Sequence, residues 1–219
     1  IVHGLFGSFA RLQGKSNYGD KSAFYSHIPL ETLCQTTEQI KVVHIVRDGR
    51  DVSLSWRKIF TGPETLIDSA TQWATHVTLK HAWGNRNPNR YLKISYEDLI
   101  TNESSVTEAV AEFASLSKKE NLVGSQKSLA SVLAKGDMHT KIGGPIITNN
   151  KNIWKTNMAE RDIRIFEYFA GPALLEMGYS LSGKQPNILE LAWFRQLYLY
   201  SKMRKLFSIR FWRLKVKNS

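Results

Sequence analysis

The stretch VVHIVRDGRDVSLSW, residues 42–56, decides the fold, because it reads as a strand that passes through a turn into a helix. Its β-branched run is typical of a buried strand over residues 42–47. We expect Asp51 to cap a helix that continues to about residue 60, and to orient Arg47. The first amide groups of such a helix and its positive dipole end point back toward the strand. This junction therefore favours a bound oxyanion.

Arg47 and Ser55 stand eight residues apart, so that a strand end, a turn and the first helical turn fit between them. A guanidinium at the end of the strand and a hydroxyl one turn into the helix can converge on one phosphate. The alternative is structural: Arg47 pairs with Asp51, and Ser55 is a small residue that faces the core. Arg50 is either a solvated turn arginine or a ligand contact.

The rest of the chain alternates helical and extended patterns, with a second clear strand over residues 90–95. Apolar periodicity and capping residues predict a series of helices, the last of them closed by Gly178. Strands that alternate with helices predict an α/β fold, in three layers, with a central parallel sheet flanked by helices. The predicted helices cover residues 4–12, 22–33, 66–84, 103–116, 126–134 and 159–176.

Composition sets wider limits on function. The 219 residues and 42% hydrophobic content suit one domain, placed here at residues 1–183, with a helical extension at 184–219. The net charge of +11 suits a polyanionic ligand or an acidic surface. The single cysteine, Cys34, rules out a disulfide within the chain, which favours a reducing, cytoplasmic location.

The extension is both basic and aromatic. Eight Lys and Arg residues follow Leu189, against one acid, Glu190. Such a segment could make peripheral contact with an anionic membrane or another polyanion. The alternative is an additional helix that packs on the body and turns its charged side to water.

Four segments resemble, in order, the sulfotransferases that use 3′-phosphoadenosine 5′-phosphosulfate (PAPS). They are GDKSAFYSHIPL, RDGRDVSLSW, YLKISYEDL and NKNIWKTNMAERDIRIFEYFAGPALLEMGY. The resemblance is greatest to the bacterial-type and tyrosylprotein-like branches, and it implies a P-loop-like fold. It also implies that Arg47 and Ser55 hold the 3′-phosphate of the cosubstrate.

The resemblance assigns further cosubstrate contacts. It places Tyr96 beside the adenine, where a core tyrosine before an acidic helix start is the alternative. A loop before the last body helix is implied to bring Lys151, Trp154 and Lys155 to the 3′-phosphate and the adenine. The alternative is a solvated polar loop in which Trp154 caps the core.

Two residues are candidates for the chemistry itself. Lys21 in GDKSAF resembles the lysine that serves the transition state in the tyrosylprotein type. His27 in HIPL resembles the general base of the cytosolic type, although Tyr25 stands where that type has a lysine. A surface lysine, and a histidine packed under Pro29, are the alternatives. Sulfuryl transfer needs a base and a cation, and the resemblance implies no metal.

No loop of the type that wraps a 5′-phosphosulfate is found near the start of this sequence. We therefore expect an N-terminally incomplete domain that lacks the first strand and phosphate loop and turns over poorly. The expected activity is transfer of a sulfuryl group to a hydroxyl of a glycan, lipid, peptide or small molecule. The alternative is a non-catalytic homologue that binds a nucleotide phosphate or a polyanion, and nucleic acid is not the expected partner.

Overall fold

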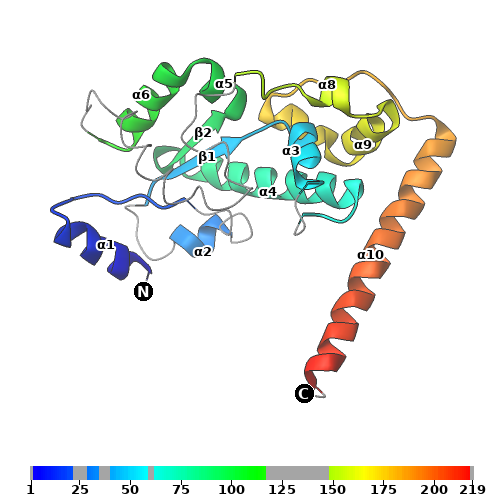
Figure 1. The fold of residues 1–219 in the computed structure, drawn as a ribbon, viewed down its shortest axis with the longest axis horizontal. Coiled ribbons are helices and arrows are strands. Elements are labelled where there is room, and N and C mark those ends of the chain that lie inside the picture. The colour runs from blue at the N-terminus through cyan, green and yellow to red at the C-terminus, as the bar shows by residue number, and fades with distance from the viewer. Residues whose placement is uncertain (1, 22–28, 35–39, 59–61, 117–147, 218–219) are drawn as a thin grey trace. The chain divides into compact units, whose positions relative to one another are not determined.

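The computed structural model describes residues 2–21, 29–34, 40–58, 62–116 and 148–217 (Figure 1). The chain divides into two compact units, residues 1–36 and 37–219. The first unit contains α1 (Val2–Leu12) and the short α2 (Leu30–Cys34). The predicted helix at 4–12 is therefore confirmed, and most of the one predicted at 22–33 lies outside the described residues.

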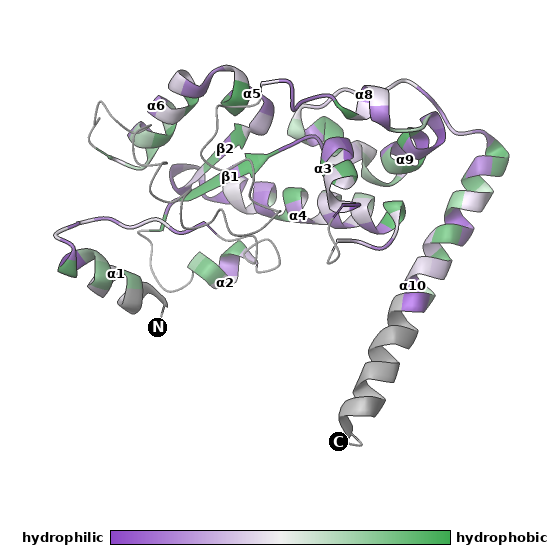
Figure 2. Ribbon diagram, viewed as in Figure 1, coloured by the Kyte–Doolittle hydropathy of each residue, from purple (hydrophilic) through white to green (hydrophobic). Residues whose placement is uncertain are grey.

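The second unit is built on two parallel strands, β1 (Val42–Val46) and β2 (Tyr91–Ser95). They pair in register, from Val42 opposite Tyr91 to Val46 opposite Ser95, so both carboxyl ends meet at one edge of the sheet. β1 is largely apolar, with four Val or Ile residues among its five, while β2 combines Leu92 and Ile94 with the polar Lys93 and Ser95 (Figure 2). In β1, however, burial alternates, with Ile45 exposed and Val46 buried, because only one face of this strand packs on the core described below.

Two long helices cover the buried face of the strands. They are α4 (Leu66–Arg86), which begins at the N-cap Thr65, and α9 (Glu160–Met177). They pack against each other beside β1, as Figure 1 shows. The core at this junction consists of Val46, Ala70, Trp73, Val77, Phe166, Ala170, Ala173, Leu174 and Met177. Gly178 ends α9 with a φ of 97°, as the sequence predicted, because glycine adopts the left-handed region without strain.

The helix after β1 differs from its prediction. α3 (Gly49–Trp56) begins two residues before Asp51, and its N-cap is Asp48, whose carboxylate accepts from the amide of Arg50 at 2.9 Å. The expectation that Asp51 caps the helix is therefore wrong. Gly49 is the first residue of α3, and a larger residue would not fit there, because a Cβ would lie 2.5 Å from the Trp73 ring.

Several shorter elements complete the second unit. β2 is preceded by the 3-10 helix η2 (Pro88–Arg90) and followed by α5 (Tyr96–Thr101) and α6 (Glu103–Phe113), and both α5 and α6 pack on β2. α8 (Trp154–Asn157) precedes α9. The sequence predicted neither α5 nor α8 as separate helices. The helix predicted at 126–134 lies outside the described residues.

The last helix, α10 (Ile188–Lys217), is packed on the body along its first half. Phe194 is fully buried against Ile67 and Ile165. Further along, the hydroxyl of Ser201 donates to Asp68 at 2.7 Å. These contacts support the packed alternative for this part of the extension, while the division into domains at residue 183 stays a prediction. Among the described residues, no helix combines the length and the apolar character needed to span a bilayer.

A buried histidine lies in the middle of β1. Nδ1 of His44 is 2.6 Å from the phenol oxygen of Tyr91 on the neighbouring strand. Burial, followed by the positive charges of Lys80, His81 and Lys93, lowers the pKa of His44 from 6.5 to about 3. His44 is therefore neutral in the folded protein at neutral pH, and its protonation favours the unfolded chain.

Replacement of Gly84 is expected to destabilise the fold. A Cβ at Gly84 would lie 2.2 Å from Cδ1 of the Tyr91 ring, so Gly84→Ala should lower the free energy of unfolding by about 1–3 kcal/mol. Gly171→Ala is the matched control, because the nearest atom there is 3.9 Å away. That variant should be neutral or slightly more stable, since alanine favours the helix. Urea unfolding of both variants tests this, and equal midpoints would contradict it.

His44 is expected to make stability depend on pH. The unfolded chain binds this proton below pH 6.5, and the folded chain binds it only near pH 3. Over that window the free energy of unfolding should fall with acidification, by up to about 1.4 kcal/mol per pH unit from this group. His44→Gln should remove this component and flatten the dependence. Urea unfolding between about pH 6.5 and 4.5 measures the difference, and parallel curves would refute it.

Candidate functional site

Arg47 and Tyr96 meet at the carboxyl edge of the sheet. Arg47 directly follows β1, and Tyr96 directly follows β2. The guanidinium carbon of Arg47 lies 4.6 Å from the centroid of the Tyr96 ring, which is a cation–π contact. Ligands gather at this edge of parallel sheets. The structure thus brings together a cation and an aromatic ring that lie 49 residues apart in the sequence.

Asn150 joins these two side chains. Nη2 of Arg47 donates to the main-chain oxygen of Asn150 at 2.9 Å and to its side-chain Oδ1 at 3.2 Å. The amide nitrogen of the same side chain donates to the phenol oxygen of Tyr96 at 2.8 Å. No local pattern selects Asn150, because it precedes α8 in a polar loop more than 100 residues away from Arg47. Only the folded chain shows that it belongs to the site.

The positive charge of Arg47 is incompletely balanced. Its nearest carboxylate oxygen, Oδ2 of Asp51, lies 3.8 Å away, and the Arg47 side chain is 19% exposed. That oxygen and Nε of Arg47 are both buried, and neither has a hydrogen-bond partner in the part of the chain that the structure describes. Burial raises the pKa of Asp51 against the opposing effects of the Trp154 amide and Arg47. Because Asp51 lies beyond hydrogen-bond distance of Arg47, the arginine has room for an additional anion.

Ser55 lies in the last turn of α3 and is exposed. It stands four residues after Asp51, so both lie on the helix face that is directed at Arg47. Among the described residues, its hydroxyl makes no hydrogen bond to Arg47. The alternative that Ser55 faces the core is therefore not what the structure shows, and its role in binding stays a prediction.

The loop and short helix α8 lie next to α3. The main-chain N–H of Trp154 donates to Oδ1 of Asp51 at 2.8 Å. Its indole is buried, with the guanidinium of Arg50 3.6 Å from the ring centroid, and its contact with the cosubstrate stays a prediction. Lys151 is half-buried and Lys155 is exposed. The lysines are the side chains of this loop that have a charge to offer an anion.

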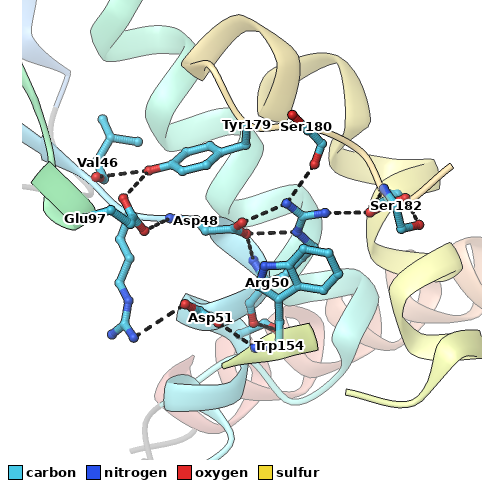
Figure 3. A network of polar contacts seen from close by, with 12 residues as sticks. Val46, Asp48, Arg50, Asp51, Glu97, Trp154, Tyr179, Ser180 and Ser182 are labelled. Atoms are coloured by element: carbon cyan, nitrogen blue, oxygen red, sulfur yellow. Dashed lines mark hydrogen bonds and ion pairs between the residues drawn. The ribbon is translucent and has the colours of Figure 1, made fainter. Parts of the chain in front are cut away.

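Arg50 is the centre of a buried polar network (Figure 3). It is 1% exposed and donates to Asp48 at 2.7 Å, to Glu167 at 2.6 Å and to the main-chain oxygen of Ser180 at 3.0 Å. Glu167 also accepts from the amide and the hydroxyl of Ser182. The interpretation of Arg50 as a solvated residue is wrong, because two carboxylates enclose it, and its interpretation as a ligand contact stays a prediction.

A second carboxylate fixes the two strand ends relative to each other. Oε1 of Glu97 accepts from the main-chain N–H of Asp48 at 3.0 Å, and Oε2 accepts from the phenol of Tyr179 at 2.9 Å (Figure 3). Burial and then the nearby charge of Glu97 raise the pKa of Tyr179, so that its phenol stays protonated and donates. Glu97 therefore couples the turn that carries Arg47 to the segment that carries Tyr96.

A cavity of about 440 Å³ opens directly on this network, and Asp48 and Arg50 form part of its wall. Its walls are formed by α8 and by the segment after α9, and they include Asn152, Trp154, Lys155, Ser180, Ser182 and Lys184. Lys184 forms an ion pair with Glu160, so its positive charge on this side of the cavity is balanced.

The two residues proposed for the chemistry lie in the first unit of the chain. Lys21 is exposed. His27 lies outside the described residues, so nothing can be added to its prediction. The assignments of both residues stay predictions.

Loss of Arg50 is expected to destabilise the fold strongly. Arg50→Ala would leave Asp48 and Glu167 buried without their cation, and breaking such a pair costs about 3–5 kcal/mol. Arg57→Ala is the matched control, because Arg57 pairs with Asp162 at the surface and its side chain is 44% exposed. It should cost no more than about 1 kcal/mol. Urea unfolding compares the two, and a similar loss in both would refute the account.

Comparison with known proteins agrees with this geometry. The model of the sulfotransferase family matches residues 2–120. Among solved structures, the sulfotransferase domain from the curacin biosynthetic pathway is similar, with a TM-score of 0.65 and 16% identity over 82% of this chain and 69% of that one. No curated protein matches. The structural likeness confirms the expected α/β fold with a parallel sheet flanked by helices. Because the family match spans more than half of the chain, the chain belongs to the sulfotransferase family.

Proposed function

We propose that this protein binds PAPS and transfers its sulfuryl group to a hydroxyl of an acceptor. The observation that carries the proposal is the state of Arg47. Its guanidinium stands at the carboxyl edge of the sheet, beside an aromatic ring, with a buried Nε that has no partner and a carboxylate no nearer than 3.8 Å. A phosphate would supply both the missing hydrogen bond and the missing charge.

In this proposal the 3′-phosphate of PAPS binds between Arg47 and the exposed hydroxyl of Ser55. Tyr96 contacts the adenine, and its ring is already oriented by the guanidinium on one face. Lys151 and Lys155 bring further positive charge from the loop before α9. Trp154 acts indirectly, because its amide holds Asp51 in place.

The chemistry requires a base and a cation. The acceptor oxygen attacks sulfur while the bond between sulfur and the bridging phosphate oxygen breaks. The acceptor proton passes to a base, for which His27 is proposed, and Lys21 meets the negative charge that develops on the bridging oxygen. The products are a sulfate ester and adenosine 3′,5′-bisphosphate.

Arg47 is expected to dominate nucleotide affinity. Arg47→Ala should weaken binding of adenosine 3′,5′-bisphosphate by about 10- to 100-fold, because hydrogen bonds to a charged group contribute about 1.5–3 kcal/mol. Titration calorimetry measures the change. Arg57→Ala, which removes a surface arginine that is paired with Asp162, should bind like the wild type.

The same titrations separate this function from general polyanion binding. A polyanion surface would lose affinity steeply with salt and would treat Arg47→Ala and Arg57→Ala alike. That outcome would overturn the proposal. Transfer of labelled sulfate from PAPS to a panel of hydroxyl acceptors then tests the enzymatic part.

A further inference from the structure

Asn150 occupies Nη2 of Arg47, one of the donor atoms through which this arginine would hold a phosphate. We propose that Asn150 is an internal placeholder, which competes with the phosphate of the nucleotide for Arg47 and sets the affinity of the site. This inference rests on the proposed function. It adds a residue that limits binding, where the family resemblance implies only residues that promote it.

The geometry of the guanidinium carries the first step. A guanidinium binds two oxygens of an anion most firmly through a pair of parallel N–H groups, such as Nε–H and one N–H of Nη2. Both N–H groups of Nη2 have acceptors in Asn150, the main-chain oxygen at 2.9 Å and Oδ1 at 3.2 Å. Nε is buried and has no partner. A two-point contact on this side of Arg47 therefore requires Asn150 to release Nη2.

The charges decide which partner prevails. The oxygens of Asn150 are neutral acceptors, whereas phosphate oxygens are charged and form hydrogen bonds that are about twice as strong. Among the described residues, the carboxylate paired with Arg47 is that of Asp51, which lies 3.8 Å from Nη2, beyond hydrogen-bond distance, so it does not occupy this donor. A phosphate would therefore displace Asn150, and the protein would lose part of the binding energy in the exchange.

Replacement of Asn150 by a phosphate on Arg47 would also change the contacts of Tyr96. The amide nitrogen of Asn150 donates to the Tyr96 phenol at 2.8 Å, while the Tyr96 ring lies against Arg47. When the Asn150 side chain leaves Nη2, this hydrogen bond breaks as well. Occupation of the phosphate site thus frees the Tyr96 hydroxyl for a hydrogen bond to the rest of the nucleotide.

Two substitutions at Asn150 test the proposal, with calorimetric titration of adenosine 3′,5′-bisphosphate as the measurement. Asn150→Ala removes one competing oxygen and the tie to Tyr96, so binding should tighten by about two- to tenfold. Asn150→Asp places a charged competitor on Arg47, so binding should weaken by at least about tenfold. Thermal unfolding of each variant should show that the fold is intact.

The neighbouring Asn149 supplies matched controls, because it is exposed and has the same side chain. Asn149→Ala should bind like the wild type, and Asn149→Asp should weaken binding only by the general effect of one added charge. In an Arg47→Ala background, Asn150→Ala should bring no gain. Weaker or unchanged binding by Asn150→Ala would overturn the placeholder. If that occurs while Arg47→Ala still weakens binding, the proposed function stands. If the wild type does not bind the nucleotide, both fall.

Discussion

The pairing of Arg50 with Asp48 and Glu167 inside the protein is the interaction on which the rest of the second unit depends. Asp48 caps α3, Glu167 lies in the middle of α9, and the Arg50 guanidinium covers the indole of Trp154 in α8. One side chain thus connects three helices around the end of β1. A buried cation tolerates few arrangements of its partners, so this contact specifies the geometry of the turn as well as its stability.

Two arginines three residues apart have opposite environments. Arg50 has hydrogen bonds to two carboxylates and a main-chain oxygen, whereas Arg47 has hydrogen bonds to the oxygens of Asn150 and a carboxylate, Asp51, no nearer than 3.8 Å. Arg50, whose charge is balanced by two carboxylates, holds the helices together. Arg47, whose charge is incompletely balanced, lies at the carboxyl edge of the sheet. The two arginines differ because the acids at the start of α3 have different partners. Asp48 pairs closely with Arg50, whereas Asp51 faces Arg47 from 3.8 Å.

Local patterns predicted the two strands, α4, and α9 with its glycine cap, because those elements follow from apolar periodicity and capping. They also placed Arg47 and Tyr96 at strand ends. The sequence could not reveal the partners of Arg50, because Glu167 lies 117 residues away and no local pattern joins the two. The contact of Asn150 with Arg47 could not be predicted for the same reason, because 103 residues separate the two. The cap was assigned to Asp51 instead of Asp48, because Asp48-Gly49 is typical of a turn, whereas in the structure Gly49 is helical and packs under Trp73.

The Glu97 carboxylate limits the size of the ligand that can bind at this edge of the sheet. By accepting from the Asp48 amide, it holds the end of one strand to the end of its neighbour. The distance between the Arg47 fork and the Tyr96 ring is then tied to the separation of adjacent strands, about 4.8 Å, and not to loop motion. The sheet therefore sets the spacing between the two contacts, and a ligand whose anionic and aromatic parts have a different spacing would not bind both.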